Sequence, residues 1–462
     1  MTLLVSFFSG KDLFLVPVCY LVLFFILRAR ANHINDPKIR GLYYRAFYFK
    51  IICVFAFTLA GQFLFNGGDS NLYYQATKDL RVAIADNSDN FWQMLKTSKL
   101  TFEHPLANYF YYDNFEDITI NYMISASNFL PGKIALIPSF LFGNSYLCIN
   151  MFFVFFALGG SIRLFKAFYY FYPRLWRHLA VACLFLPGVI FWSSGLLKDP
   201  ITFASIGFIL YAVVQIVFEK RNYFNSVLWI LLCVYLLYTI KVYILLVLTL
   251  SLLVWFFAEF NKWVKDRTLR YIFTVMTFAG SAILGYVLLN YLTSLEAARG
   301  FKLDTLLNSA EGQRKVFELI GQRQGGSHFT INDSNQVLLV LNSIVATFFR
   351  PFIWEINTPI ALLSALESAA FLLLTLFIIF KRGLLKFFTV SFSDGRILMC
   401  FVFAFVFAFA VGSSTTNFGA LSRYKIPCTP FYLLFLLLLF NKQGLPLPRW
   451  FERIVGFTIP KN

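Results

Sequence analysis

The chain has 462 residues, of which 59% are hydrophobic and only 14% charged, and its formal net charge is +17. A soluble globular protein would contain about a quarter charged residues, so the composition excludes that class. Several apolar runs approach the ~20 residues that a helix needs to cross a bilayer. The sequence therefore predicts an all-α polytopic membrane protein, with residues 1–462 forming a single transmembrane domain.

Eleven apolar segments are predicted to span the membrane. The first, Leu13 to Leu27, is followed by Arg28 and Arg30 instead of a small-residue cleavage site, so we interpret it as a retained helix and not as a signal peptide. Two weaker stretches, 121–142 and 336–349, suit interfacial or re-entrant segments better than spans. The remaining ten predicted spans are residues 47–65, 146–166, 179–196, 200–218, 226–240, 242–258, 271–292, 358–380, 397–412 and 427–440.

The distribution of basic residues predicts the orientation, because short cytoplasmic loops collect Lys and Arg. With the N-terminus outside and the C-terminus cytoplasmic, the inner loops hold 24 basic and six acidic residues, and the outer segments hold 16 of each. Glu367 lies within a span. The basic charge therefore reflects orientation in the membrane, and nucleic-acid binding is not needed to explain it. The inner loops are 28–50, 163–178, 219–224, 259–270, 381–396 and 441–462.

The first long outer loop, residues 66–120, opens with "NGGDSNLYY". Asp69 follows Gly67 and Gly68 at the end of an apolar segment, which predicts that its carboxylate lies near the membrane surface. The two glycines leave the backbone room to approach a ligand. Asp69 is the candidate catalytic residue, and Tyr73 is assigned to substrate binding beside it.

The same loop contains "SDNFWQMLKTSKL" at residues 88–100. Ser88 suits the N-cap position of a helix, and Phe91, Trp92 and Leu95 fall on one side of it, with lysines elsewhere. This pattern predicts a short interfacial helix that lies on the lipid surface.

The corner "SGLLKDP" at residues 194–200 places Lys198 and Asp199 at the outer end of one predicted helix, with Pro200 starting the next. One interpretation is a helix cap with a local ion pair. The other is that these charges contribute to a substrate site shared with Asp69. The sequence leaves both open.

The second long outer loop, residues 293–357, contains the glycine-rich stretch "GQRQGGSHF", which suits a mobile cover over a substrate. It then leads through 336–349, the re-entrant or interfacial segment, to "FFRPFIWE". Arg350, flanked there by aromatic residues, suits a membrane anchor or a phosphate-binding group, and Glu355 lies close to it in sequence.

Two further cations precede the last predicted span, in "LSRYKIP". On the outer side, the tendency of basic residues to lie inside does not explain Arg423 and Lys425. A contact with a lipid phosphate or a substrate phosphate does. Arg350, Glu355, Arg423 and Lys425 are therefore assigned to substrate binding, together with Lys198 and Asp199.

The order of these features resembles the GT-C superfamily of membrane glycosyltransferases, which includes polyprenol-dependent mannosyl-, aminoarabinosyl- and oligosaccharyltransferases. The resemblance covers residues 60 to 440 loosely and rests on four stretches on one side of the membrane. They are "GGDSNLYYQ", "LFGNSYLCINMFFVFFALGGSIRLF", "PGVIFWSSGLLKDP" and "SRYKIPCTPFYLL".

The resemblance implies transfer of a sugar from a polyprenyl phosphate or diphosphate to a glycan, lipid or protein acceptor. Asp69 would orient the acceptor and take its proton. Arg350, Arg423 and Lys425 would stabilise the departing lipid phosphate. The outer acids could also bind a divalent cation, as in oligosaccharyltransferases, although many members of the superfamily need none. The expected location is a bacterial inner membrane, with the active site facing the periplasm or the exterior.

Two other functions remain open. A polymerase of polysaccharide repeat units would use nearly the same outer cations, and only the acceptor separates it from a transferase. A transporter of lipid-linked glycans would instead require charged residues deep within several spans. By sequence, only Glu367 lies clearly inside one, and Lys241 lies in a short break between two others.

Overall fold

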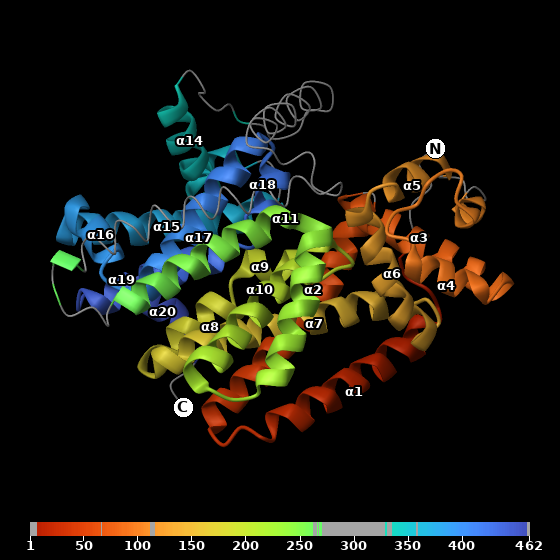
Figure 1. The fold of residues 1–462 in the computed structure, drawn as a ribbon, viewed down its shortest axis with the longest axis horizontal. Helices are drawn as coiled ribbons and strands as arrows, with labels where there is room; N and C mark the ends of the chain where they lie inside the picture. The colour runs from red at the N-terminus through yellow and green to blue at the C-terminus, as the bar shows by residue number, and fades with distance from the viewer. Residues whose placement is uncertain are drawn as a thin grey trace. The chain divides into compact units, whose positions relative to one another are not determined.

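Every element in the described part of the chain is helical, in agreement with the predicted fold class (Figure 1). In a helix all backbone hydrogen bonds form within the segment, which hydrocarbon surroundings require. The chain forms two compact units. The computed structural model describes residues 7–65, 67–110, 116–261, 266, 268–269, 329, 335–356 and 359–459.

Unit 1 comprises Met1–Phe171 and Ile190–Lys241. Its longest helices are α2 and α7, and a π-helical turn follows α10. The elements are α1 (Asp12–Ala31), α2 (Pro37–Phe63), α3 (Gly68–Asp86), α4 (Asp89–Lys96), η1 (Pro105–Phe110), α5 (Glu116–Met123), α6 (Ala126–Leu141), α7 (Tyr146–Phe171), α10 (Lys198–Val214), η3 (Gln215–Glu219) and the first part of α11 (Tyr223–Asn261).

Unit 2 comprises Tyr172–Val189 and Val242–Lys461. Its centre is α19, in which every residue from Thr429 to Phe440 is buried. The elements are η2 (Pro173–Leu175), α8 (Trp176–Leu184), α9 (Pro187–Trp192, which ends in unit 1), the second part of α11, α14 (Gln336–Phe349), η5 (Ile353–Glu355), α15 (Pro359–Arg382), α16 (Leu384–Ser391), α17 (Gly395–Ser414), α18 (Phe418–Tyr424), α19 (Thr429–Lys442) and α20 (Arg449–Thr458).

The chain is an integral membrane protein by the length and composition of its helices. Among the described residues, seven helices are long and apolar enough to cross a membrane, and the bent pair α18–α19 makes an eighth if it counts as one span. Six of the predicted spans correspond to single helical segments, namely α1, α2, α7, α10 with η3, α15 and α17. The predicted span 271–292 lies outside the described residues.

Residues 179–196 do not form one helix, so this predicted span is wrong as a continuous segment. α8 ends at Leu184, and α9 begins only at Pro187. Proline has no backbone N–H and disfavours helical conformation in the residue before it, which accounts for the break. After α9 ends at Trp192, residues 193–197 run without helical structure into α10.

The break predicted between 226–240 and 242–258 is confirmed. α11 is interrupted at Lys241, where φ is −149° and ψ is 78°. An unbroken helix of 39 residues would be about 58 Å long, roughly twice the thickness of the hydrocarbon core. The last predicted span, 427–440, corresponds to the 14-residue helix α19, which makes an angle of 65° with α18.

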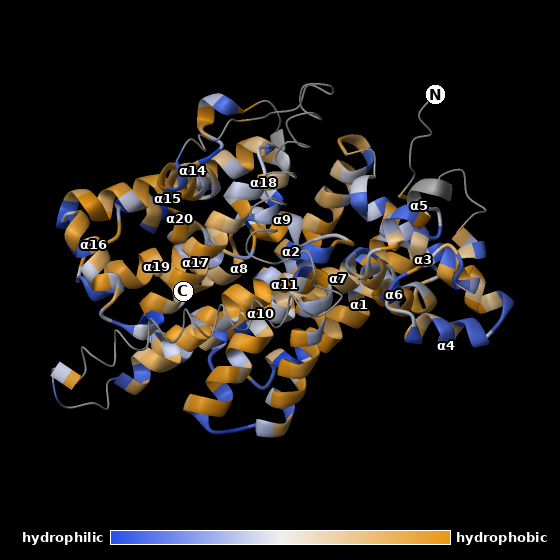
Figure 2. Ribbon diagram, turned by 45° about the horizontal axis from the view of Figure 1, so that its top comes forward, coloured by the Kyte–Doolittle hydropathy of each residue, from blue (hydrophilic) through white to orange (hydrophobic). Residues whose placement is uncertain are grey.

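The predicted surface helix forms as α4, and Ser88 occupies its N-cap position as predicted. The Ser88 side chain makes no capping hydrogen bond; the Asn87 side chain accepts one from the Asp89 N–H at 2.9 Å instead. Trp92 and Leu95 are at least half exposed, as an interfacial helix requires. Figure 2 shows that α4 is largely hydrophilic, whereas α6 and α7 are largely hydrophobic.

The two weak apolar stretches also form helices. α6 has 16 residues and α14 has 14, so both are shorter than the ~20 residues of a typical span. α14 packs on α17, where the Thr347 hydroxyl donates to the Ala408 carbonyl at 2.8 Å. These lengths agree with the prediction of interfacial or re-entrant segments.

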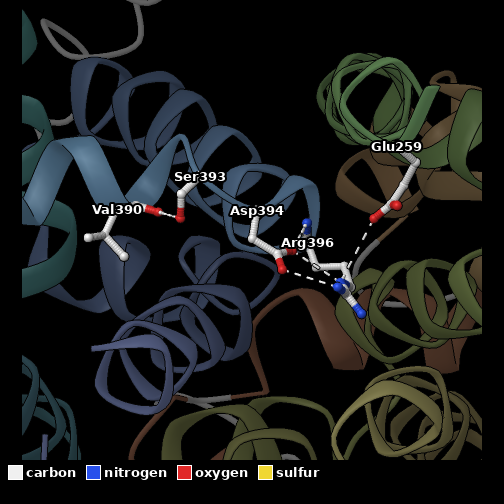
Figure 3. A network of polar contacts seen from close by, with 5 residues as sticks. All are labelled: Glu259, Val390, Ser393, Asp394 and Arg396. Carbon is white, nitrogen blue, oxygen red and sulfur yellow. Dashed lines mark hydrogen bonds and ion pairs between the residues drawn. The ribbon is translucent and has the colours of Figure 1, made fainter. Parts of the chain in front are cut away.

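Three of the predicted inner loops meet in unit 2. Figure 3 shows two of them, which meet at Glu259 and Arg396. Asp394 caps α17 by accepting a hydrogen bond from the Arg396 N–H at 2.9 Å, and the Arg396 guanidinium donates to the same carboxylate at 3.1 Å. That guanidinium also lies 3.9 Å from the Glu259 carboxylate and 5.2 Å from the centre of the Tyr172 ring. These interactions therefore join loops that the charge pattern assigns to the same side.

Small residues let α7 and α10 approach at backbone distance in unit 1. A Cβ atom on Gly160 would lie 2.3 Å from the Ala204 Cα, and one on Gly207 would lie 2.1 Å from the Gly160 carbonyl oxygen. Helices in a bilayer associate through such close packing, because lipid provides little hydrophobic drive between them. The α7–α10 crossing is consequently specified by glycine.

Gly160→Ala should destabilise the protein by about 2–3 kcal/mol, because the new methyl group meets backbone atoms that cannot move aside. Gly41→Ala is the matched control, since Gly41 lies inside α2 with open space around it. Thermal unfolding in detergent, followed by size-exclusion fluorescence, would measure both variants. Equal midpoints for the two variants would contradict the close α7–α10 crossing.

Candidate functional site

Asp69 lies in the first turn of α3 and is half-buried. The preceding glycines form a tight turn, with φ of +85° at Gly67 and +51° at Gly68. A Cβ at Gly67 would lie 2.7 Å from the Asn71 side chain, so both the positive φ and the lack of space require glycine at this position. The turn places the Asp69 carboxylate at the N-terminal end of α3, where the helix dipole stabilises negative charge.

α3 is held in unit 1 by the hydroxyl groups along it. Ser70 and Tyr146 share a hydrogen bond of 2.6 Å, and the hydroxyls of Tyr73 and Tyr122 lie 3.2 Å apart. Tyr73 is completely buried, so the predicted substrate-binding tyrosine is part of the packing between α3 and α5. The predicted first outer loop thus begins with a helix packed into unit 1.

Lys198 and Asp199 are the first two residues of α10, whereas the prediction placed them at the end of the preceding helix, with Pro200 starting the next. Their side chains contact different partners. The Lys198 ammonium donates to the Ser127 hydroxyl at 2.9 Å. The Lys241 ammonium donates to the Asp199 carboxylate at 2.7 Å, and the two side chains are 10% and 1% exposed. The structure therefore contains an ion pair, but its cation comes from the break in α11. We call Ser127, Lys198, Asp199 and Lys241 the corner cluster.

A signal for this pair is present in the sequence, although the predicted site does not include Lys241. That lysine is the only charged residue between Tyr223 and Ala258. A charge in such an apolar stretch needs a partner, because moving it out of water alone costs several kcal/mol. Asp199 is the partner that the fold brings to it.

The corner before α10 is positioned by side chains from α2 and α7. Asn150 accepts a hydrogen bond from the Leu196 N–H at 2.7 Å and donates to the Thr58 hydroxyl at 3.2 Å. A Cβ on Gly195 would lie 1.9 Å from the Phe57 ring, so the corner packs directly on α2. These interactions fix the position at which α10 begins with Lys198 and Asp199.

The structure corrects the prediction that Lys50 lies in an inner loop. α2 begins at Pro37, with the Asp36 side chain accepting from the Lys38 N–H at 2.9 Å, so Lys50 lies in the middle of the helix. It is 1% exposed, and its ammonium donates to the Ser193 hydroxyl at 2.8 Å. The Asp-Pro pair at residues 36–37 is a helix-start signal, whereas the predicted span begins ten residues later, at the apolar run.

In unit 2, Lys425 lies between α18 and α19 and is only 3% exposed. Its ammonium donates to the Ser368 hydroxyl at 2.9 Å and to the Arg350 carbonyl at 3.2 Å. The Ser368 hydroxyl donates to the same carbonyl at 3.0 Å. Two segments predicted on the outer face, around Arg350 and Lys425, are thus joined within this unit.

The Arg350 side chain is paired with Glu355. Its Nε lies 3.1 and 3.2 Å from the two carboxylate oxygens, and a terminal nitrogen also contacts this carboxylate. The guanidinium carbon lies 4.6 Å from the ring centre of Phe329 and 5.3 Å from that of Phe418. Glu355 therefore balances the charge of Arg350 within this segment.

The predicted site residues therefore fall into two groups. Asp69, Tyr73, Lys198 and Asp199 belong to unit 1, and Arg350, Glu355, Arg423 and Lys425 belong to unit 2. Arg423 lies in the last turn of α18 and is half-buried. Within the described residues, no group of three or more His, Cys, Asp or Glu side chains could hold a metal ion.

Comparisons with protein-family models, with curated proteins and with solved structures find no match to this chain. Its function is therefore inferred from the residues and interactions described above.

Lys241→Met should destabilise unit 1 by about 3–5 kcal/mol, because it leaves the Asp199 carboxylate buried without its charge partner. Asp199→Asn combined with Lys241→Met should recover part of that loss, since no charge then remains unpaired. Arg221→Met is the matched control: it breaks the ion pair with Glu219, in which the Arg221 side chain is 59% exposed, and should have little effect. Thermal unfolding of the three variants tests this order, and an equal effect of Lys241→Met and Arg221→Met would contradict it.

Proposed function

We propose that this protein is a membrane glycosyltransferase that moves a sugar from a polyprenyl phosphate or diphosphate to an acceptor. The reaction would take place on the outer face of a bacterial inner membrane. The observation that best supports this function is the buried Lys425 ammonium. Its two hydrogen bonds go to neutral oxygens beside Arg350, at the entry to the late helix α19. A cation held in this way suits a phosphate leaving group, whose negative charge grows during transfer.

Asp69 is the proposed base. It would orient the acceptor hydroxyl or amine and take its proton as the bond to the anomeric carbon forms. The turn at Gly67 and Gly68 supports this role, because it holds the carboxylate half-buried at the start of a packed helix. Lys198 and the Asp199–Lys241 pair would line the same side of unit 1, since Ser127, the partner of Lys198, starts α6, which packs on α3.

The proposed orientation rests on the charge pattern, and the surroundings of Arg396 support it. Loops expected inside meet one another around Arg396, and segments expected outside meet around Lys425. Both sets of interactions lie within unit 2, so neither depends on how the two units are placed relative to each other. The expected donor is embedded in lipid, which suits a site between helices.

Transport of a lipid-linked glycan is the second candidate, and one observation favours it. That function expects charged residues deep within several helices, and the structure buries more of them than the sequence indicated. Lys50 in α2, the Asp199–Lys241 pair and Glu367 in α15 are all largely removed from solvent. A transporter would leave the chemistry of its substrate unchanged, so the accumulating lipid-linked species separates the two functions.

Asp69→Asn should lower the transfer rate by about 10²–10⁴-fold, because the amide cannot take a proton from the acceptor. The test uses a strain that lacks the protein, with its glycans and lipid-linked sugars profiled after complementation by wild type or variant. The Asn variant should leave the glycosylated polyprenyl donor accumulating. Asp89→Asn is the control, since Asp89 is an exposed acid at the start of α4.

Full complementation by Asp69→Asn at matched expression would remove Asp69 from the mechanism. Accumulation of a finished lipid-linked glycan on the inner leaflet of the deletion strain would instead indicate transport. The acceptor found in the wild-type product distinguishes a transferase from a repeat-unit polymerase.

A further inference from the structure

α15 presents three buried polar side chains to the interior of unit 2. Ser364, Glu367 and Ser368 are 5%, 8% and 0% exposed. Residues three and four apart lie on the same face of a helix, so these side chains form one polar stripe. Ser368 is satisfied by Lys425 and the Arg350 carbonyl. The other two side chains are not fully satisfied.

The Glu367 carboxylate uses one of its two oxygens. Oε2 accepts a hydrogen bond from the Gly188 N–H at 3.0 Å, whereas Oε1 is buried and has no hydrogen-bond partner among the described protein atoms. A Cβ on Gly188 would lie 2.5 Å from Oε2, so any side chain there would push the carboxylate away from this N–H. Glu367 is thus held firmly on one side and presents an unpaired acceptor on the other.

Ser364 adds a second unpaired group on the same stripe, because its buried hydroxyl also has no partner in the described protein. Leaving a buried polar group unpaired costs about 1–3 kcal/mol, and more for a charged one. Most buried polar atoms in proteins are hydrogen-bonded, so two unpaired oxygens three residues apart point to a ligand that pairs with them.

The third component is Lys425. Its ammonium interacts electrostatically with the Glu367 carboxylate and donates to Ser368. The stripe therefore combines an acceptor at Glu367, a donor and acceptor at Ser364 and a cation at Lys425. Hydroxyl groups next to a phosphate match this set.

We propose that Ser364 and Glu367 bind hydroxyl groups of the sugar in the lipid-linked substrate, while Lys425 contacts its phosphate. This inference rests on the proposed function and adds the residues that recognise the sugar. The sugar should be uncharged, because the Lys425 ammonium already interacts electrostatically with the Glu367 carboxylate and would repel a second cation. A neutral hexose or pentose is therefore expected to bind more tightly than an aminosugar.

The test measures binding to the full-length protein in lipid nanodiscs. The probes are decaprenyl phosphate, its mannosyl, glucosyl and arabinosyl conjugates, and the conjugate of 4-amino-4-deoxyarabinose. Wild type should bind at least one neutral conjugate about tenfold more tightly than decaprenyl phosphate, as expected for hydrogen bonds to a charged acceptor. The affinity of the aminosugar conjugate should exceed that of decaprenyl phosphate by a smaller factor.

Glu367→Gln should remove most of the gain in affinity that a neutral sugar conjugate has over decaprenyl phosphate. The Gln oxygen can keep the bond to the Gly188 N–H, which leaves an NH₂ donor where the unpaired acceptor was. Ser364→Ala is the second variant and removes the neighbouring hydroxyl without changing charge. Both variants should bind decaprenyl phosphate itself within about twofold of wild type, since Lys425 is intact. Ser391→Ala is the control, because Ser391 is buried in α16 and, among the described residues, its hydroxyl donates only to its own helix, at the Phe387 carbonyl.

The outcomes separate this inference from the proposed function. If wild type binds none of the decaprenyl phosphates, the proposed function fails for polyprenyl monophosphate donors, and this inference fails with it. If it binds decaprenyl phosphate but no neutral conjugate more tightly, or if both variants keep the gain, the sugar site on α15 is wrong and the proposed function stands. Tighter binding of the aminosugar conjugate than of every neutral one would also overturn the inference.

Discussion

A carboxylate and an ammonium that both leave water have to compensate each other, and in unit 1 Asp199 and Lys241 do so at 2.7 Å. The polar residues at the start of α10 and at the break in α11 depend on that pair. Asp199 can take part only because the corner before it is fixed by Asn150 and by the close approach of Gly195 to α2. Lys241 can take part because α11 leaves helical geometry at this residue.

The same constraint shapes unit 2 around Lys425. Its ammonium is buried and satisfied by a serine hydroxyl and a backbone carbonyl, while the Arg350 charge is balanced by Glu355. Two cations that look equivalent in sequence consequently have different surroundings. Arg350 is paired with a carboxylate in its own segment, whereas the Lys425 ammonium donates to neutral oxygens and interacts electrostatically with Glu367 in α15.

Backbone approach at glycine recurs wherever the structure is tightest. Gly160 and Gly207 bring α7 and α10 together, Gly195 brings the corner onto α2, and Gly188 brings a backbone N–H to Glu367. At Gly188 the absence of a side chain lets a polar backbone N–H reach the buried Glu367 carboxylate. The proposed sugar site depends on this at Gly188, since any side chain there would displace the carboxylate.

Hydrophobicity and charge along the chain were sufficient to predict an all-helical membrane protein, most of its long helices and the break at Lys241. These properties are local, because span length and helix interruption depend on neighbouring residues. The partners of Asp199 and Lys425, the burial of Lys50 and the unpaired oxygen of Glu367 were decided by tertiary structure alone. Each depends on which helix packs beside which, and in an apolar chain many pairings would satisfy the same hydrophobic pattern.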